Sequence, residues 1–366
     1  MADVFVEGRP ATLDEAVARA TSLLAGARLP LIAGLGTDIA GIRASVRLAE
    51  AVGAAIDHLA AESVLRNASV MRDTGWMIAS PGEVRRHADL IMFIGDQMTS
   101  AWPGMLEHIA PASQNATLVS LCAADIETAA GMAGRRIERL DIGAELLPGV
   151  LSGLRARLAG RKITAAPELR DRLDALAVLL KSARYGAIVW SAETLDELAI
   201  EMVVGLIRDL NMNRRFVGLP LAAGDNGTGA LQACGWLTGY PMRTAFGGSA
   251  FRSGARAPLH DPWAYSADRL VQSGEADAVL WISAMRPAVP AWSRDLPMVA
   301  LVAPGAAFAR PPHVRIEVGI PGIDHGAVLF GNEAGGLIAC EASAKSDKPS
   351  VDAVVGAIGA RLEGRA

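Results

Sequence analysis

His87-Ala-Asp-Leu-Ile-Met-Phe-Ile-Gly95 and Glu275-Ala-Asp-Ala-Val-Leu-Trp-Ile-Ser283 are two versions of one short phrase, and they decide the fold class. In each, an Ala-Asp pair leads into an apolar run that ends in small residues. Such a run, bounded by polar and turn residues, is typical of a strand buried on both faces of a parallel sheet. Each phrase has an apolar stretch upstream that precedes a helical pattern, Leu29-Pro-Leu-Ile-Ala-Gly34 and Tyr185-Gly-Ala-Ile-Val-Trp190. The sequence therefore predicts an α/β fold with two tandem, doubly wound, Rossmann-like units.

The chain length of 366 residues suits two such units. We predict a first unit at 1–160, with C-terminal segments able to complete it, and a second at 161–366 with a glycine-rich insertion at 217–262. Because open parallel sheets bind ligands at the carboxyl ends of strands, any ligand is expected between the two halves. Further strands are expected at 116–121, 135–141, 298–303 and 314–318, and helices at 12–25, 41–53, 144–158, 167–183, 194–211 and 350–362.

Bulk properties exclude several classes of partner. The net charge is −4 and no basic stripe occurs, which argues against nucleic acid because phosphate binding needs clustered cations. No apolar run reaches the roughly 18 residues that a membrane span needs. The first residues lack the basic and apolar regions of a signal peptide. We therefore expect a cytoplasmic protein that does not contact a membrane.

Motifs for common cofactors are missing. Cys122, Cys234 and Cys340 are far apart, so no local zinc or iron–sulfur motif exists, and no pair of histidines has the spacing of a zinc protease. The glycines from Gly34 to Gly41 follow a strand but do not have the spacing of a dinucleotide fingerprint. A plain turn between strand and helix is the better interpretation.

Three places carry candidate binding residues. Asp225 and Asn226 can cap a helix beginning near Thr228, whose free N–H groups could face an anion. His58 follows a short strand, and Asp324-His325 lies in a late loop, so either could donate to a ligand. The alternative for each is structural: a capped helix packed on the sheet, or a solvated loop histidine. The candidates in the helix region are Asp225, Asn226, Gly227, Thr228, Gly229 and Trp236.

The segment Asp225-Asn-Gly-Thr-Gly-Ala-Leu-Gln-Ala-Cys-Gly-Trp-Leu-Thr-Gly-Tyr-Pro241 resembles the B subunit of formylmethanofuran dehydrogenases, a branch of the molybdopterin oxidoreductases. Residues 81–96, 273–283, 287–291 and 320–330 fit the same pattern, and the resemblance runs from about residue 10 to the C-terminus. It implies a cleft derived from a pterin site, formed by His58, Gly95, Asp96, Asp225, Asn226, Gly227, Thr228, Gly229, Trp236, Asp324 and His325.

The chain departs from this family at its redox ligands. Active members begin with a cysteine-rich motif that holds a [4Fe–4S] cluster, whereas this chain has no cysteine before Cys122. Active members also place a cysteine or selenocysteine on the metal, and the matching position here is Ser63. The resemblance therefore implies that the molybdenum or tungsten bis-pterin guanine dinucleotide, the cluster and the iron–sulfur domain are lost. We expect no cofactor, no metal and no catalytic residue, with Ser63 a vestige of the ligand position.

A related bacterial assembly, the formyltransferase/hydrolase complex of methylotrophs, fits these departures. The resemblance implies a non-catalytic B subunit beside a zinc hydrolase A subunit, a C subunit and a formyltransferase D subunit. That complex moves a formyl group from tetrahydromethanopterin to a methanofuran-type carrier and releases formate.

Two alternatives remain open on sequence grounds. One is an active molybdenum or tungsten bis-pterin protein that uses Ser63 as its metal ligand. The other is a different nucleotide-binding α/β protein, such as the middle domain of a thiamin-diphosphate enzyme, although no thiamin-diphosphate motif is present.

Overall fold

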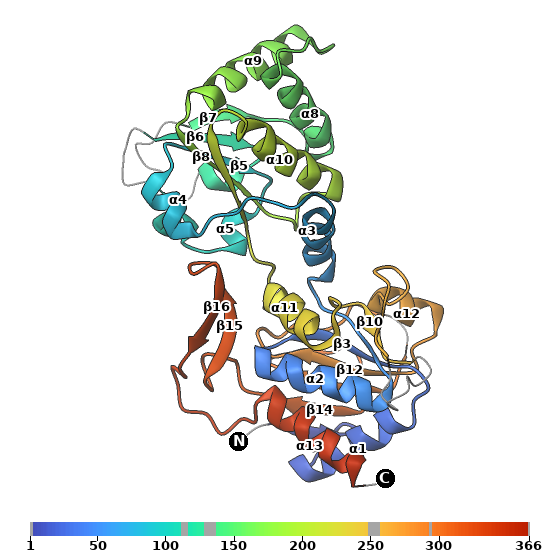
Figure 1. Cartoon of the computed structure of the whole chain (residues 1–366). Coiled ribbons are helices and arrows are strands. Elements are labelled where there is room, and N and C mark those ends of the chain that lie inside the picture. Colours follow the sequence, from blue (N-terminus) through green and yellow to red (C-terminus); the bar gives the residue numbers. More distant parts are fainter. Residues whose placement is uncertain (1–2, 111–115, 128–136, 248–256, 293–294, 365–366) are drawn as a thin grey trace. The chain divides into compact units, whose positions relative to one another are not determined.

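The computed structural model describes residues 3–110, 116–127, 137–247, 257–292 and 295–364 (Figure 1). The chain forms two compact units, and each combines segments that are distant in the sequence. Unit 1 consists of Met1–Ala61, Gly224–Phe330 and Leu337–Ala366, whereas unit 2 consists of Glu62–Ala223 and Gly331–Gly336. Unit 2 is thus inserted into the sequence of unit 1.

Unit 1 contains, within the described residues, a nine-stranded sheet in the order β11-β10-β4-β3-β12-β13-β14-β1-β2. Its central strands from β4 to β14 are parallel, and the strands at both edges are antiparallel. The strands are β1 Val4–Val6, β2 Arg9–Pro10, β3 Pro30–Gly36, β4 Ala55–Ile56, β10 Thr244–Ala245, β11 Leu259–His260, β12 Ala278–Ser283, β13 Met298–Val302 and β14 Val314–Glu317. The helices are α1 Leu13–Ala25, α2 Ile39–Val52, α11 Gly227–Thr238, α12 Ala267–Ser273 and α13 Val351–Glu363.

Unit 2 contains a parallel sheet in the order β7-β6-β5-β8-β9. Its strands are β5 Leu90–Ile94, β6 Thr117–Leu121, β7 Ile137–Leu140, β8 Tyr185–Trp190 and β9 Arg215–Pro220. Its helices are α3 Ala61–Thr74, α4 Pro81–His87, α5 Met98–Ala101, α6 Met105–Ile109, α7 Ala124–Glu127, the short 3-10 helix η1 Ala144–Leu146, α8 Leu147–Leu158, α9 Pro167–Ser182 and α10 Glu197–Leu210. A separate hairpin, β15 Ala327–Gly331 and β16 Gly336–Cys340, follows β14.

The two halves of the sequence exchange strands. In chain order β3, β4, β5, β6 and β7 form one repeat, and β8, β9, β12, β13 and β14 form the next. In space β3 and β4 pair with β12 to β14, while β8 and β9 pair with β5 to β7. Under this correspondence both units have the same parallel order, β4-β3-β12-β13-β14 and β9-β8-β5-β6-β7.

This exchange corrects the expected domain arrangement. The Ala-Asp strand at 88–94 pairs with the upstream strand of the second half, and the one at 278–283 pairs with that of the first half. The expected boundary between residues 160 and 161 therefore marks the end of a sequence repeat and falls inside unit 2. The helix expected at 194–211 begins later, at Glu197, and Asp196 caps it by accepting from the N–H of Ala199. Residues 248–256, part of the expected insertion at 217–262, lie outside the described residues.

The repeated Ala-Asp pair has one structural role in both units. The Asp277 carboxylate accepts hydrogen bonds from the backbone N–H groups of Arg28 at 2.9 Å and Leu29 at 3.0 Å. The Asp89 carboxylate accepts from the N–H groups of Arg184 at 3.0 Å and Tyr185 at 3.1 Å. Each carboxylate thus satisfies N–H groups at the start of the neighbouring parallel strand, which would otherwise lack a partner.

Asp277→Ala is expected to lower the unfolding free energy by about 2 kcal/mol, because two backbone donors lose a charged acceptor. Burial opposes ionisation of Asp277, but the hydrogen bonds from Arg28 and Leu29 outweigh it and hold the pKa below its ordinary value. A carboxyl group with a lowered pKa makes its full contribution to stability above its pKa in the unfolded chain. That contribution is lost as the pH falls through its pKa in the folded chain. Urea unfolding at neutral and acidic pH measures both effects. The exposed Asp73→Ala serves as control, and equal losses in the two variants would contradict this role.

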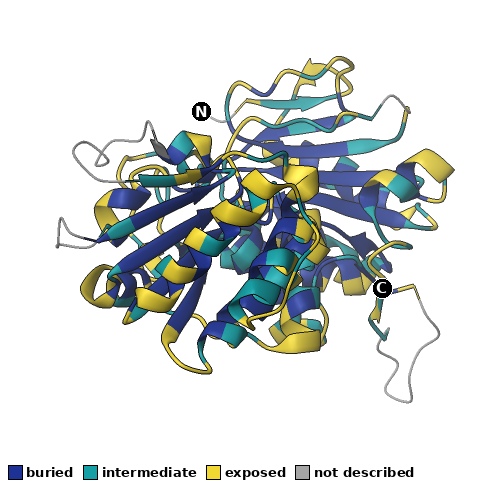
Figure 2. Ribbon diagram, turned by 90° about the horizontal axis from the view of Figure 1, so that it is seen from above, coloured by how far each residue is buried: buried dark blue, intermediate teal, exposed yellow. Residues whose placement is uncertain are grey.

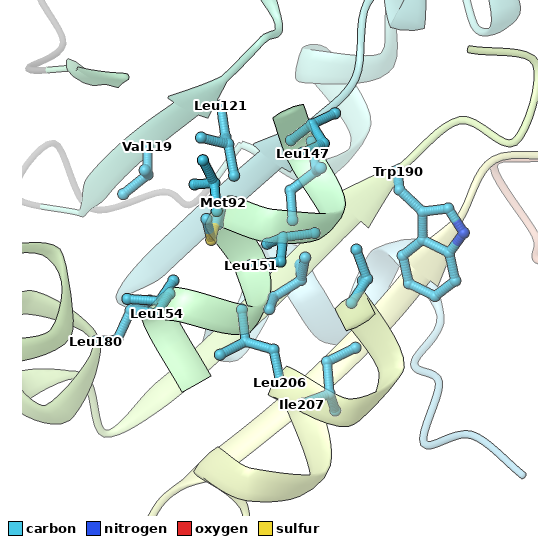
Figure 3. Close-up of a cluster of buried hydrophobic side chains, with 14 of the residues drawn as sticks. Met92, Val119, Leu121, Leu147, Leu151, Leu154, Leu180, Trp190, Leu206 and Ile207 are labelled. Atoms are coloured by element: carbon cyan, nitrogen blue, oxygen red, sulfur yellow. The ribbon is translucent and has the colours of Figure 1, made fainter. Parts of the chain in front are cut away.

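The sheets form the cores because their strands alternate between two helix-covered faces. In β5 the side chains of Leu90, Met92 and Ile94 pack toward α8, α9 and α10, and those of Ile91 and Phe93 pack toward α4, α5 and α6. Figure 2 shows the buried strands and the exposed outer faces of the helices. Figure 3 shows the first of these clusters, with Met92, Leu151 and Leu206 among its members. This burial on both faces is what the apolar repeats predicted.

Candidate functional site

The predicted site residues are divided between the two units. Nine belong to unit 1: His58, Asp225, Asn226, Gly227, Thr228, Gly229, Trp236, Asp324 and His325. Ser63, Gly95 and Asp96 belong to unit 2.

In unit 1 three of these residues meet where β3 and β12 end. The Asn226 side chain donates to the carbonyl of Thr37 at 2.8 Å and accepts from the N–H of Phe330 at 2.9 Å. The ring Nε2 of His58 lies 3.1 Å from the carbonyl oxygen of Asp225. The Asp225 carboxylate forms an ion pair with Arg286 at 2.7 Å. The switch point of the strand order is therefore occupied by side chains that bind backbone groups of the neighbouring loops and, in the Asp225–Arg286 pair, each other.

These contacts correct the expected helix cap. α11 begins at Gly227, and Asn226 precedes it with a φ of 61° and makes no side-chain cap bond. The side-chain amide of Asn226 is instead used by Thr37 and Phe330, and the carboxylate of Asp225 by Arg286. Gly229 permits this arrangement, because a Cβ at that position would lie 2.3 Å from Asn226 Oδ1. The side chains of Asp225 and Asn226 thus connect loops and strands of unit 1 and are not free to bind an anion.

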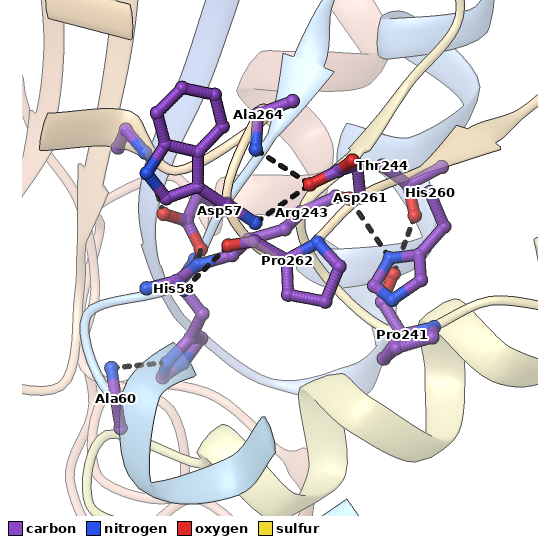
Figure 4. Close-up of polar contacts among 12 residues, drawn as sticks. Asp57, His58, Ala60, Pro241, Arg243, Thr244, His260, Asp261, Pro262 and Ala264 are labelled. Atoms are coloured by element: carbon purple, nitrogen blue, oxygen red, sulfur yellow. Dashed lines mark hydrogen bonds and ion pairs between the residues drawn. The ribbon is translucent and has the colours of Figure 1, made fainter. Parts of the chain in front are cut away.

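A second cluster lies around Asp57, next to His58, and the sequence patterns did not predict it (Figure 4). The buried Asp57 carboxylate accepts from the N–H groups of His58 and of Ala267, the first residue of α12, both at 2.8 Å. Arg243 Nε lies 3.5 Å from the same carboxylate, and its Nη1 donates to the carbonyl of Pro262 at 2.7 Å. Asp57 therefore connects β4 with the loop before β10 and with the start of α12. The sequence feature that could have indicated this cluster is Asp57, a carboxylate directly after the buried strand β4.

Burial shifts the pKa values of Asp57 and His58 in opposite directions. Desolvation raises the pKa of Asp57 from 3.8 to about 6, although Arg243 and two N–H groups partly offset it. Desolvation lowers the pKa of His58 from 6.5 to about 4. His58 is thus a neutral ring that accepts from the N–H of Ala60 at 2.9 Å and donates to the Asp225 carbonyl.

His58→Gln is expected to make stability fall as the pH rises from 4 to 6. Because the pKa of Asp57 is raised in the folded chain, its contribution to stability is complete below its pKa in the unfolded chain. That contribution is lost as the pH rises through the folded-state pKa of about 6. The lowered pKa of His58 acts oppositely, since its contribution is lost as the pH falls through about 4. Each shift corresponds to about 3 kcal/mol, so the two nearly cancel in the native chain. Unfolding free energies across this pH range measure the slope, with exposed His87→Gln as control. If the unfolding free energy of His58→Gln did not change with pH, the shifts of Asp57 and His58 would not oppose each other.

The remaining predicted residues of unit 1 lie elsewhere. Trp236, in α11, is 66% exposed. Asp324 Oδ2 accepts from the N–H of Ile320 at 2.8 Å, and the His325 ring lies against the carbonyl of Gly326. The side chains of Asp324 and His325 therefore stabilise their own loop, apart from the cluster around Asp225.

In unit 2 the predicted residues follow the ends of buried elements. Gly95 directly follows β5 with a φ of 93°, and a Cβ there would lie 2.8 Å from Thr194 Oγ1. Thr194 also donates to the carbonyl of the exposed Asp96 at 3.3 Å. Ser63 is buried in the first turn of α3. Gly95 and Thr194 thus mark the carboxyl ends of β5 and β8, where the strand order of unit 2 reverses.

Carboxylates close the helix N-termini at these edges. Asp38 accepts from the N–H of Gly41 in α2 at 3.0 Å, and Asp196 accepts from that of Ala199 in α10 at 2.7 Å. Asp57 does the same for α12 through Ala267. Dinucleotide pyrophosphates bind to open helix N-termini in sheets of this kind. These three ends already hold a negatively charged acceptor, so they repel an anion.

Fold and site together define a class: an α/β protein with two parallel cores of the same strand order, exchanged strands, and polar clusters at the strand ends. No protein-family model matches the chain. It is 32% identical, over 99% of its length and 97% of the relative's, to the B subunit of the formyltransferase/hydrolase complex from Methylorubrum extorquens. The crystal structure of that complex, FhcABCD with methylofuran, contains a chain that matches with a TM-score of 0.85 over 99% of both chains.

The chain therefore belongs to the family of B subunits of formyltransferase/hydrolase complexes. A more distant relative is the B subunit of the tungsten-containing formylmethanofuran dehydrogenase 2 of Methanocaldococcus jannaschii. The identity is 28% over 295 residues, which cover 74% of this chain and 63% of that protein. The resemblance seen in the sequence is thus confirmed. No helix among the described residues is long and apolar enough to cross a membrane.

Proposed function

We propose that this chain is a non-catalytic, structural subunit of a cytoplasmic formyltransferase/hydrolase complex in one-carbon oxidation. The complex transfers a formyl group from tetrahydromethanopterin to a methanofuran-type carrier and releases formate. The observation that carries the proposal is the end-to-end match, in sequence and structure, with the B subunit of such a complex. Its partners are the zinc hydrolase A subunit, the C subunit and the formyltransferase D subunit.

The tungsten-containing relative raises the question of a metal–pterin group, and the residues of this chain do not fit one. Ser63 stands at the position that the resemblance assigns to the metal ligand. Asp38, Asp57 and Asp196 close the helix ends that a pyrophosphate would need. These features favour a scaffold over a redox protein.

The architecture supports the same descent. Two five-stranded parallel cores of equal order are consistent with Rossmann-like units inherited from the central domains of molybdopterin oxidoreductases, without their iron–sulfur domain. In the proposed scaffold the former ligand clefts are held by His58, Asp225, Asn226 and Arg286. In this proposal they stabilise the fold: His58 binds the Asp225 carbonyl, the Asp225 carboxylate pairs with Arg286, and Asn226 binds the backbone of Thr37.

Co-purification and formate release test the proposal. The tagged chain is expected to bring down the hydrolase and formyltransferase subunits, and the assembly is expected to release formate from formyl-tetrahydromethanopterin plus carrier. Ser63→Ala should retain nearly the full rate, because Ser63 takes no part in the chemistry. A chain that purifies without these subunits, or a Ser63→Ala assembly that loses formate release while remaining intact, would contradict the proposal.

A further inference from the structure

The amino-terminal edge of the unit 2 sheet carries a concentration of positive charge. Its exposed cationic side chains, here called the basic edge, are Arg85, Arg86, Lys181, Arg184, Arg214 and Arg215. They lie at the ends of α4 and α9 and at the starts of β8 and β9. Contacts connect them, since Arg214 Nε donates to the Lys181 carbonyl at 2.7 Å and the ring of His87 packs on Tyr185. This edge is basic although the chain as a whole has a net charge of −4.

The carboxylates at this edge are used within the protein. Glu83 accepts from the Tyr185 hydroxyl at 2.5 Å, Asp89 holds the N–H groups at the start of β8, and Asp209 pairs with Arg155 at 2.7 Å. In the described part of the chain, none of Arg85, Arg86, Lys181 and Arg214 forms an ion pair with a carboxylate. Arg184 pairs with Asp89 at 3.4 Å, so among the described residues the cations of the edge that carry no ion pair are Arg85, Arg86, Lys181 and Arg214.

Helix dipoles favour cations at helix C-termini, which alone could explain such an edge. The exchanged repeat provides a direct comparison, because α4, α9 and α10 of unit 2 correspond to α12, α1 and α2 of unit 1. In its last turn α4 carries Arg85, Arg86 and His87, α9 carries Lys181, and α10 carries Arg208. Their unit 1 counterparts carry no basic residue there. The same fold is thus stable without these cations.

The strand starts differ in the same way. Arg214 and Arg215 lead into β9, whereas the strand pairings place the uncharged Val52 and Gly53 at the corresponding positions before β4. Arg214 and Lys181 also line a hollow of about 650 Å³. Met212, which is 77% exposed, lies at its rim and offers an apolar contact. Unit 2 therefore has an indented surface whose cations have no counterpart at the equivalent described positions of unit 1.

We propose that the basic edge is a docking surface for a carboxylate-rich surface of another protein of the complex, an inference that rests on the proposed function. Guanidinium and ammonium groups bind carboxylates through charge-assisted hydrogen bonds, and complementary charge speeds association and fixes the orientation of partners. A nucleic acid would also supply anions. The net charge of −4, however, disfavours a long phosphate backbone that extends beyond the edge. Separate carboxylates on a protein can face each cation individually.

A matched pair of charge reversals tests the docking surface in the full chain. Arg86→Glu/Lys181→Glu reverses two cations of the basic edge, and Arg43→Glu/Arg47→Glu makes the same charge change on the exposed face of α2. The first readout is binding of an oligoglutamate peptide at low salt, and the second is co-purification with the other subunits. The basic-edge variant should bind the peptide about tenfold more weakly and lose partner subunits, while the α2 variant should match the native chain.

The outcomes separate this inference from the proposed function. Equal behaviour of the two variants, in peptide binding and in assembly, would overturn the docking surface and leave the subunit role intact. Peptide binding that depends on the basic edge, in a native chain that brings down no hydrolase or formyltransferase, would support the surface and contradict the subunit role. Stronger binding of a single-stranded oligonucleotide than of the peptide would also overturn the choice of partner.

Discussion

Gly34→Ala is expected to lower the unfolding free energy by about 3 kcal/mol or more. The φ of Gly34 is 80°, and a Cβ at this position would lie 2.4 Å from the carbonyl oxygen of Ile282. That oxygen belongs to the backbone of β12, which cannot move without disturbing its pairing with β3. The substitution thus acts on the contact by which the first half of the sequence joins the second.

Gly160→Ala is the control for this prediction. Gly160 has a φ of 72°, but a Cβ there would meet no atom within 4 Å. It should therefore cost only about 1 kcal/mol, the strain of the left-handed backbone. Urea unfolding of both variants gives the difference. Similar losses for the two variants would mean that β3 and β12 do not approach each other as described.

Asp57→Ala is expected to lower the unfolding free energy by about 3–5 kcal/mol at pH 8, because it leaves the buried Arg243 without its carboxylate. The side chain of Arg243 is 14% exposed and that of Asp57 is 6% exposed, so water cannot replace the lost partner. The first N–H of α12 also loses its acceptor. The expected result is a large fall in the urea midpoint with an unchanged slope of the transition.

A double-mutant cycle separates the ion pair from general damage at this site. Arg243→Met removes the cation and retains much of the buried side-chain volume. Once Arg243 is replaced, Asp57→Ala should cost markedly less, because no uncompensated cation remains. Additive losses in the double variant would show that Asp57 and Arg243 do not depend on each other.

Local patterns were sufficient to locate the strands but not to pair them. The apolar runs at 88–94, 186–190 and 278–283 are β5, β8 and β12. Their hydrophobicity reports burial on two faces, which any neighbour in a parallel sheet provides. Asp89 and Asp277 can each satisfy the start of either upstream strand, so the repeat itself makes the two pairings locally equivalent. The exchange is decided by contacts between residues that are far apart in the sequence.

Only part of the candidate site could be predicted, because contacts between residues distant in the sequence complete it. His58, Asp225 and Asn226 meet in unit 1, and local patterns predict them because His58 follows a strand and the other two precede a helix. Arg286 and Thr37 gave no such signal. They become site residues only because the loops after β12 and β3 converge on the Asp225–Asn226 turn. Tertiary convergence of this kind leaves no trace in local composition.

The central claim is that this family member acts as a scaffold and not as a metal–pterin protein. The most direct test is the molybdenum, tungsten and pterin content of the complex purified through this chain. The account predicts formate-releasing complex with no pterin and no molybdenum or tungsten bound to this chain. About one atom of either metal per chain, together with pterin, would contradict it.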